Sequence, residues 1–201
     1  DLAVKNALWR TLDAACAENV VFASNTSSLP IAAMAAVTHR ADRFLGLHFF
    51  SPVPMMPLVE VIRSVATSDE TFDRAIRFAR SLGKEAVVAR DTPGFIVNRL
   101  LVPYMIDAAR EAARGLASIP DIDQAMKLGC GHPMGPLTLL DMIGLDTALK
   151  VAEVMYQEFR EPQFAPPPVL RRMVTMGYLG RKSGRGFYDY SVTPPRPVAV
   201  A

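Results

Sequence analysis

The stretch that decides the fold reads FLGLHFFSPVPMMPLVEVI and runs from Phe44 to Ile62. Two short apolar runs flank a proline-rich loop, and their β-branched, aromatic and leucine residues are typical of buried strands. Each run carries one titratable side chain, His48 in the first and Glu60 in the second. A carboxylate in a buried strand costs several kcal/mol unless a partner compensates it. The simplest partner for Glu60 is therefore the imidazole of His48 in the neighbouring run.

A histidine paired with a glutamate indicates acid–base chemistry, because the carboxylate orients the imidazole and raises its basicity as a general base. A histidine in an apolar strand is also common as a core residue with satisfied hydrogen bonds. The residues themselves leave both interpretations open.

Length and composition limit the class of protein. The chain has 201 residues, which is enough for one large or two small domains, and 50% of them are hydrophobic. The formal net charge of +2 gives no case for nucleic-acid binding. The apolar run from Leu100 to Ile106 stops at Asp107, too short to span a membrane, so we expect no membrane partner.

The cysteines indicate the compartment of the protein, and the first residue bears on whether the chain is part of a longer one. Cys16 and Cys130 have no metal or disulfide spacing, so we expect a reducing compartment and no metal site. The chain begins at Asp1 without a methionine, and we therefore expect it to be part of a longer protein.

The first part of the chain alternates between helical and strand patterns. We predict helices over residues 2–17 and 69–82 and strands over residues 20–23 and 85–89. The loop Ser24–Ser28 follows the first strand. Its polar side chains can cap the next turn, or they can form the wall of a site, since ligands bind at the carboxyl ends of strands in α/β sheets.

From residue 92 to about residue 180 every periodic segment looks helical. We predict that Thr92 caps a helix whose first residue is Pro93 and which reaches about Arg114, and we predict further helices over residues 121–128, 136–159 and 169–176. Asn98 falls on the inward side of the first of these, where it either serves a site or bonds backbone at a helix junction.

The end of the chain has two distinct segments. We expect the aromatic residues at the end of segment 180–190 to pack back onto the helices. Residues 191–201 are rich in proline, valine and alanine, and we expect a flexible tail. The predicted domains are therefore residues 1–91 and 92–190, followed by the tail 191–201.

Taken together, these motifs resemble those of the 3-hydroxyacyl-CoA dehydrogenase family, which includes the 3-hydroxybutyryl-CoA dehydrogenases. Each motif alone is weak, but as an ordered set they are specific and span about residues 1–190. The matching stretches are Ser24–Leu29 (SNTSSL), Gly46–Phe50 (GLHFF), Leu58–Ile62 (LVEVI), Asp91–Arg99 (DTPGFIVNR), Gly131–Pro136 (GHPMGP) and Gly184–Tyr188 (GRGFY).

The resemblance implies a fold and an activity. It implies the second part of a Rossmann-type NAD-binding domain, an α/β fold, followed by an all-α domain that forms a homodimer. The family oxidises L-3-hydroxyacyl-CoA to 3-ketoacyl-CoA with NAD, in fatty acid β-oxidation or butanoate metabolism. It implies a cytoplasmic enzyme, or one of the mitochondrial matrix in a eukaryote.

The resemblance also assigns catalytic roles to residues whose motifs match. His48 is the general base that takes the hydroxyl proton, and Glu60 orients it and stabilises its charged form. Ser27 and Asn98 bind the substrate oxygen and the base. Base and cofactor must converge on one C–O unit, because hydride leaves the carbon easily only as the hydroxyl loses its proton.

Cofactor and substrate contacts follow in the same way. Asn25 and Lys5 fall where the family contacts the nicotinamide half of NAD. Ser51 stands where most members have asparagine, and we expect it to tune substrate binding. The family's glycine-rich dinucleotide fingerprint lies upstream and is absent from these residues, so we expect the 201 residues alone to be inactive.

Two alternatives remain from the sequence. The chain could be a non-enzymatic dimerisation fragment, or it could belong to a related hydroxy-acid dehydrogenase that does not use CoA. The polar set Ser27, His48, Glu60 and Asn98 favours an enzyme over a dimerisation fragment, because a dimerisation module has no need of buried polar groups that reduce stability.

Overall fold

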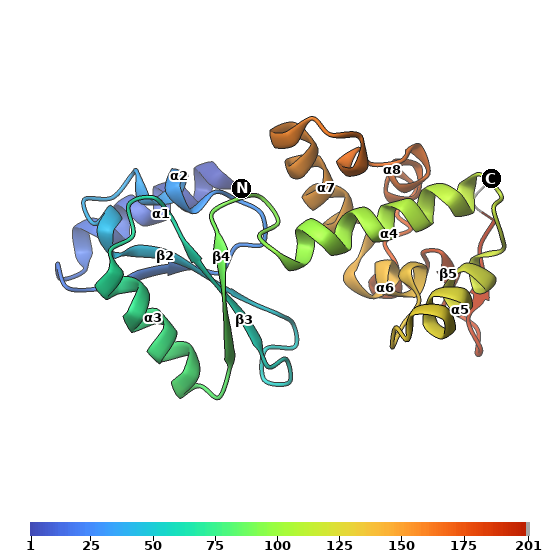
Figure 1. Cartoon of the computed structure of the whole chain (residues 1–201). Helices are drawn as coiled ribbons and strands as arrows, with labels where there is room; N and C mark the ends of the chain where they lie inside the picture. Colours follow the sequence, from blue (N-terminus) through green and yellow to red (C-terminus); the bar gives the residue numbers. More distant parts are fainter. Residues whose placement is uncertain (200–201) are drawn as a thin grey trace. The chain divides into compact units, whose positions relative to one another are not determined.

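The computed structural model describes residues 1–199. The chain consists of two compact units, Asp1–Val97 and Asn98–Ala201. The first unit is an α/β layer structure and the second is built from helices (Figure 1). This is the fold class that the sequence predicted.

A single sheet forms the centre of the first unit. Its strands are β1 (Phe22–Ser24), β2 (Phe44–Phe49), β3 (Leu58–Arg63) and β4 (Glu85–Arg90), in the order β1-β2-β3-β4. β1 and β2 are parallel, β2 and β3 antiparallel, and β3 and β4 parallel. The two apolar runs of the deciding stretch are thus neighbouring antiparallel strands.

Helices cover both faces of this sheet (Figure 1). On one face α1 (Leu2–Ala15) and α2 (Ile31–Ala35) contribute to a core with Phe44 and Ile62. On the other face α3 (Asp69–Ser81) packs on the alternate residues of the strands, among them Leu45 and Val61. Because side chains alternate along a strand, His48 and Glu60 share the face of Phe44 and Ile62.

Gly46 allows the close approach of α2 to this face. A Cβ atom at Gly46 would lie 2.8 Å from Cδ1 of Ile31 and 2.9 Å from Cβ of Ile62. Both neighbours are completely buried, so neither has room to move away.

The first long helix of the second unit begins later than predicted. α4 runs from Val97 to Ala113, and the prediction that Thr92 caps it with Pro93 as its first residue is wrong. Gly94 and Phe95 have φ angles of 80° and 46°, which are left-handed and cannot continue an α-helix. Residues 92–96 instead form a turn between β4 and α4.

Four more helices complete the second unit. They are α5 (Ile119–Cys130), α6 (Pro136–Ile143), α7 (Leu145–Phe159) and α8 (Pro168–Thr175), joined with short 3₁₀ turns at Pro162–Phe164 and Arg181–Ser183. The single helix predicted over 136–159 is wrong, because Gly144 with a φ of 101° separates α6 from α7. The core gathers apolar side chains from all of α4 to α8 together with Phe187.

The segment before the end of the chain packs onto the helices, as predicted. Two buried carboxylates hold it. Asp141 accepts hydrogen bonds from Phe187 N at 2.8 Å, Tyr188 N at 2.9 Å and the Tyr190 hydroxyl at 2.9 Å. Asp123 accepts one from the Tyr188 hydroxyl at 2.8 Å.

Part of the segment expected as a flexible tail is paired in the structure. β5 (Tyr188–Asp189) and β6 (Arg196–Pro197) pair antiparallel. Val198 donates from its backbone to Phe187 O at 2.9 Å and its side chain is buried. These contacts connect residues 196–198 to the preceding segment. The flexibility of residues 191–201 stays a prediction, and residues 200 and 201 lie outside the described residues.

Within residues 1–199, no helix is both long enough and apolar enough to cross a membrane.

Candidate active site

The centre of the site is the pair that the sequence predicted. His48 and Glu60 are directly opposite each other in the β2–β3 ladder. His48 Nδ1 lies 2.6 Å from Oε2 of Glu60. His48 is 4% exposed and Glu60 is 0% exposed. The antiparallel register therefore places a carboxylate and an imidazole against each other in a site from which water is excluded.

Ser27 extends this pair to three groups. Its hydroxyl lies 3.0 Å from Nε2 of His48, on the opposite side of the ring from Glu60. The loop that carries Ser27 is fixed by Thr26, whose hydroxyl accepts from Ser28 N and Leu29 N at 3.4 and 3.1 Å. Thr26 therefore fixes the turn that follows β1, and Ser27 is left to reach His48.

The second oxygen of Glu60 binds backbone. Oε1 accepts hydrogen bonds from Ile96 N at 3.0 Å and Val97 N at 2.9 Å. The carboxylate thus has two backbone donors at Oε1 and the imidazole at Oε2, so both of its oxygens have a partner. Sequence analysis missed these two N–H groups because it treated residues 93–97 as helix, although Thr-Pro-Gly is also a turn pattern.

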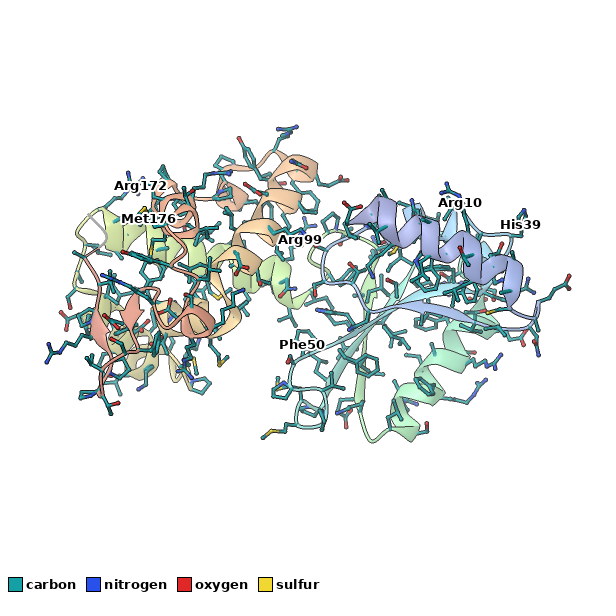
Figure 2. All side chains as sticks on the ribbon, turned by 180° about the vertical axis from the view of Figure 1, so that it is seen from behind. Arg10, His39, Phe50, Arg99, Arg172 and Met176 are labelled. Atoms are coloured by element: carbon teal, nitrogen blue, oxygen red, sulfur yellow. The ribbon has the colours of Figure 1, made fainter. Side chains whose placement is uncertain are left out.

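Two aromatic rings enclose the imidazole. The centroid of Phe50 lies 4.5 Å and that of Phe95 5.6 Å from the centroid of His48, both with tilted rings. Phe50 follows β2 directly, and Figure 2 labels it at the end of that strand. These apolar walls lower the local dielectric and so strengthen the hydrogen bonds of His48.

The arrangement defines what the site can do. With a carboxylate at Nδ1, the ring proton is held on Nδ1, and Nε2 keeps a lone pair that can accept a proton from an oxygen. The order hydroxyl, imidazole, carboxylate suits proton transfer with a substrate hydroxyl, and it equally suits activation of the serine as a nucleophile. Geometry alone does not choose between these two chemistries.

The other predicted site residues are placed as follows. Asn25 is exposed, and its Oδ1 accepts a hydrogen bond from Phe49 N at 2.9 Å. Lys5 is half-buried on α1, and Ser51 is exposed in the loop after β2. Within the described chain no hydrogen bond links Lys5 or Ser51 to the pair. Asn98 is half-buried on α4 and opens the second unit.

No metal site accompanies these groups. Among residues 1–199, no three His, Cys, Asp or Glu side chains gather so that they could hold a metal ion.

Both parts of the chain match models of one protein family. Residues 1–92 match the family described as "3-hydroxyacyl-CoA dehydrogenase, NAD binding domain". Residues 94–190 match "3-hydroxyacyl-CoA dehydrogenase, C-terminal domain".

Individual relatives agree with this. The mouse protein "Hydroxyacyl-coenzyme A dehydrogenase, mitochondrial" is 53% identical over 191 residues, which cover 94% of this chain and 61% of the mouse protein. The "3-hydroxybutyryl-CoA dehydrogenase" of Mycobacterium tuberculosis is 50% identical over 192 residues, covering 94% and 67%. The chain thus spans less than two thirds of the length of its mouse relative.

A solved structure matches the fold as well. The crystal structure of (S)-3-hydroxybutyryl-CoA dehydrogenase PaaH1 from Ralstonia eutropha superposes with a TM-score of 0.92 at 52% identity. The match covers 94% of this chain and 67% of that one.

Proposed function

This chain belongs to the 3-hydroxyacyl-CoA dehydrogenase family, and on that premise we propose that its site oxidises the hydroxyl group of an L-3-hydroxyacyl-CoA to a ketone with NAD. The observation that carries the proposal is the line of Ser27, His48 and Glu60, joined at 3.0 and 2.6 Å, in which His48 and Glu60 are buried. A nucleophilic serine would need no redox cofactor, whereas residues 1–92 are an NAD-binding domain of this family.

Each of the three groups has a defined task in this reaction. Nε2 of His48 accepts the proton of the substrate hydroxyl. Glu60 stabilises the imidazolium that results, and it holds the ring in place through Nδ1. Ser27, in hydrogen-bond contact with the same nitrogen, binds the substrate oxygen beside it. Base catalysis of this kind contributes about 10²–10⁴-fold to the rate.

The residues present fit the nicotinamide half of the cofactor. When bound, NAD accepts the hydride from the carbon that carries the hydroxyl group. Phe49 N occupies Oδ1 of Asn25 at 2.9 Å, and this fixes the amide so that its exposed NH₂ group can donate to a carboxamide oxygen. Lys5, on α1 of the same unit, supplies a positive charge for the rest of the nicotinamide half of NAD.

The remaining assignments rest on motif positions. Asn98 and Ser51 contact the substrate, and Asn98 binds the same substrate oxygen as Ser27. Residues 1–91 form part of the nucleotide domain and residues 92–190 form the domain for substrate and dimer contacts. Asn98 follows Val97, whose backbone binds Glu60, and this short separation along the chain supports a role close to the catalytic pair.

We assign the second unit to a homodimer interface. Several large apolar side chains of this unit are more than two-fifths exposed in this chain, and a second copy would cover such a surface. They are Leu100, Leu116, Leu128, Met142 and Met176.

One experiment tests the activity. The glycine-rich strand–turn–helix that binds a pyrophosphate is absent from the 201 residues. We compare the 201 residues alone with an extended chain, in which the family's glycine-rich segment precedes Asp1. The extended chain should bind NAD and reduce acetoacetyl-CoA with NADH, and His48→Gln should lower kcat by at least a hundredfold while NAD affinity holds.

Each outcome of this experiment tests a different part of the proposal. An extended chain that binds NAD but has no turnover refutes the proposed activity. Near wild-type turnover in His48→Gln refutes the assignment of the base. Turnover by the 201 residues alone would show that our account of cofactor binding is wrong.

A further inference from the structure

We propose that the turn Thr92–Val97 is a positioning element of the catalytic pair, because its two backbone N–H groups hold the carboxylate of Glu60 in the orientation that faces His48. This inference rests on the function proposed above and adds residues that the motif assignments leave without a role.

The carboxylate of Glu60 is divided between two partners. Oε1 accepts from Ile96 N at 3.0 Å and Val97 N at 2.9 Å, and Oε2 lies 2.6 Å from Nδ1 of His48. Glu60 is completely buried, so no solvent can replace a missing donor. With Oε1 occupied, Oε2 can bind only the imidazole, and a carboxylate oxygen accepts. The proton of His48 is therefore held on Nδ1, and Nε2 is free to act as the base.

The backbone that presents these N–H groups is strained. Phe95 has a φ of 46°, in the left-handed region that residues with a side chain rarely adopt, and Gly94 before it has a φ of 80°. Strain of this kind persists only where the surroundings enforce it, and it concentrates at functional sites. Phe95 is 3% exposed and its ring lies 5.6 Å from that of His48. Phe95 thus directs the backbone toward Glu60, and its ring packs beside the imidazole of His48.

The start of α4 differs from that of the helices that have a capping side chain of their own. α1, α3 and α5 are capped by a side chain of the residue directly before them, Asp1, Ser68 and Ser118. α4 is preceded by the apolar Ile96. Its first N–H groups bind instead to Glu60, a strand residue far away in sequence. The start of α4 and the orientation of the base therefore depend on the same carboxylate.

A single substitution separates this role from side-chain packing. Val97→Pro removes one N–H donor, and proline is well tolerated as the first residue of a helix. Val97→Ala is the matched control, because it shortens the side chain and keeps the N–H. In the extended chain we expect Val97→Pro to lower kcat roughly ten- to a hundredfold, the factor that corresponds to a lost hydrogen bond to a charged group. KM should stay within about twofold, and Val97→Ala should lower kcat far less than Val97→Pro does.

Nitrogen NMR of the 201-residue chain gives a readout that needs no turnover. The chain has three histidines, and the His48 signals are those that vanish in His48→Gln. In the wild type, at a pH where the ring is neutral, we expect the proton on Nδ1. In Val97→Pro a second form with the proton on Nε2 should appear, and it should be absent in Val97→Ala.

The design distinguishes failure of the inference from failure of the function. If Val97→Pro leaves both the NMR signals and kcat unchanged, the turn does not position the pair. If Val97→Pro does not fold, an ester at residue 97, made with the hydroxy acid that matches valine, removes the same N–H without the ring, and the same signals decide. If the wild-type extended chain has no turnover but the NMR change appears, the positioning role stands and the proposed activity does not.

Discussion

Replacing Glu60 with glutamine should remove most of the catalytic power of this site while keeping its shape. The amide has one oxygen and one NH₂ group in place of two oxygens. If the NH₂ group faced Ile96 N and Val97 N, which now bind Oε1, two buried donors would lose their acceptor. At about 1–3 kcal/mol for each unsatisfied group, that orientation is disfavoured by about 2–6 kcal/mol.

The amide oxygen will therefore face the two backbone N–H groups, and the NH₂ group will face Nδ1 of His48. A donor at that position requires Nδ1 to accept, so the ring proton moves to Nε2. Nε2 then carries a proton where the base needs a lone pair. The loss should approach the whole contribution of base catalysis, about 10²–10⁴-fold in kcat or about 3–5 kcal/mol.

The assay is steady-state reduction of acetoacetyl-CoA by the extended chain, with nitrogen NMR of His48 to follow the proton. Glu85→Gln is the matched control, because Glu85 is exposed on the neighbouring strand and loses the same charge. We expect wild-type kinetics from that control. If Glu60→Gln keeps kcat within about threefold of wild type, or if it loses activity while His48 keeps its proton on Nδ1, the reasoning about the tautomer is refuted.

Three further predictions concern the second unit. Gly186→Ala should lower the free energy of unfolding by about 1–3 kcal/mol, because its Cβ would lie 2.0 Å from Oδ1 of Asp141; Gly129→Ala, with no atom within 4 Å, is the control that should be neutral or slightly stabilising in urea melts. Asp141→Asn should cost about 1–3 kcal/mol, since an amide cannot accept from all three donors. Burial raises the pKa of the Asp141 carboxyl above 3.8. The free energy of unfolding of the wild type should therefore fall relative to that of Asp141→Asn as pH rises from 3.8 through the raised pKa. Urea melts in which the stability advantage of the wild type grows over this pH range would contradict this. Light scattering of the extended chain at micromolar concentration should give the mass of a dimer, and a monomer mass would contradict the proposed interface.

The catalytic pair could be predicted from the sequence because two simple rules agree there. Strand alternation and antiparallel pairing place opposite residues of neighbouring strands side by side. A buried glutamate also requires a partner, and His48 is the only titratable residue of the facing run. The class of each unit followed from periodicity in the same way.

The start of α4 could not be predicted, because local and tertiary preferences disagree there. Thr92 and Pro93 have the propensities of a helix start, whereas the structure needs a turn that aims two N–H groups at Glu60. A left-handed phenylalanine at position 95 runs against propensity. Only the contacts of Phe95 and of the two following N–H groups compensate for it, and these lie far away in sequence.

A related pattern recurs at two other helices that have no capping side chain of their own. α2 begins after Pro30 and α6 after Gly135, and neither has a side-chain cap. Asp91 accepts from Ile31 N and Ala32 N of α2, each at 2.7 Å. In the second unit Asp123 accepts from the first backbone N–H groups of α6. A helix that lacks a cap, together with an acidic residue in an apolar segment elsewhere, is therefore a signal that sequence analysis could have used.

The same comparison shows how the contacts of Glu60 differ from those of the other carboxylates. In Asp91, Asp123 and Asp141 both carboxylate oxygens accept from backbone N–H groups. Hydroxyl groups donate in addition to Asp123 and Asp141. Such carboxylates fix one segment onto another, and their donors do not titrate near neutral pH. Glu60 alone among the four gives one oxygen to the backbone and the other to an imidazole. Capping a helix does not require a partner that can gain and lose a proton. This difference supports the role that we propose for Glu60, which is to orient a base.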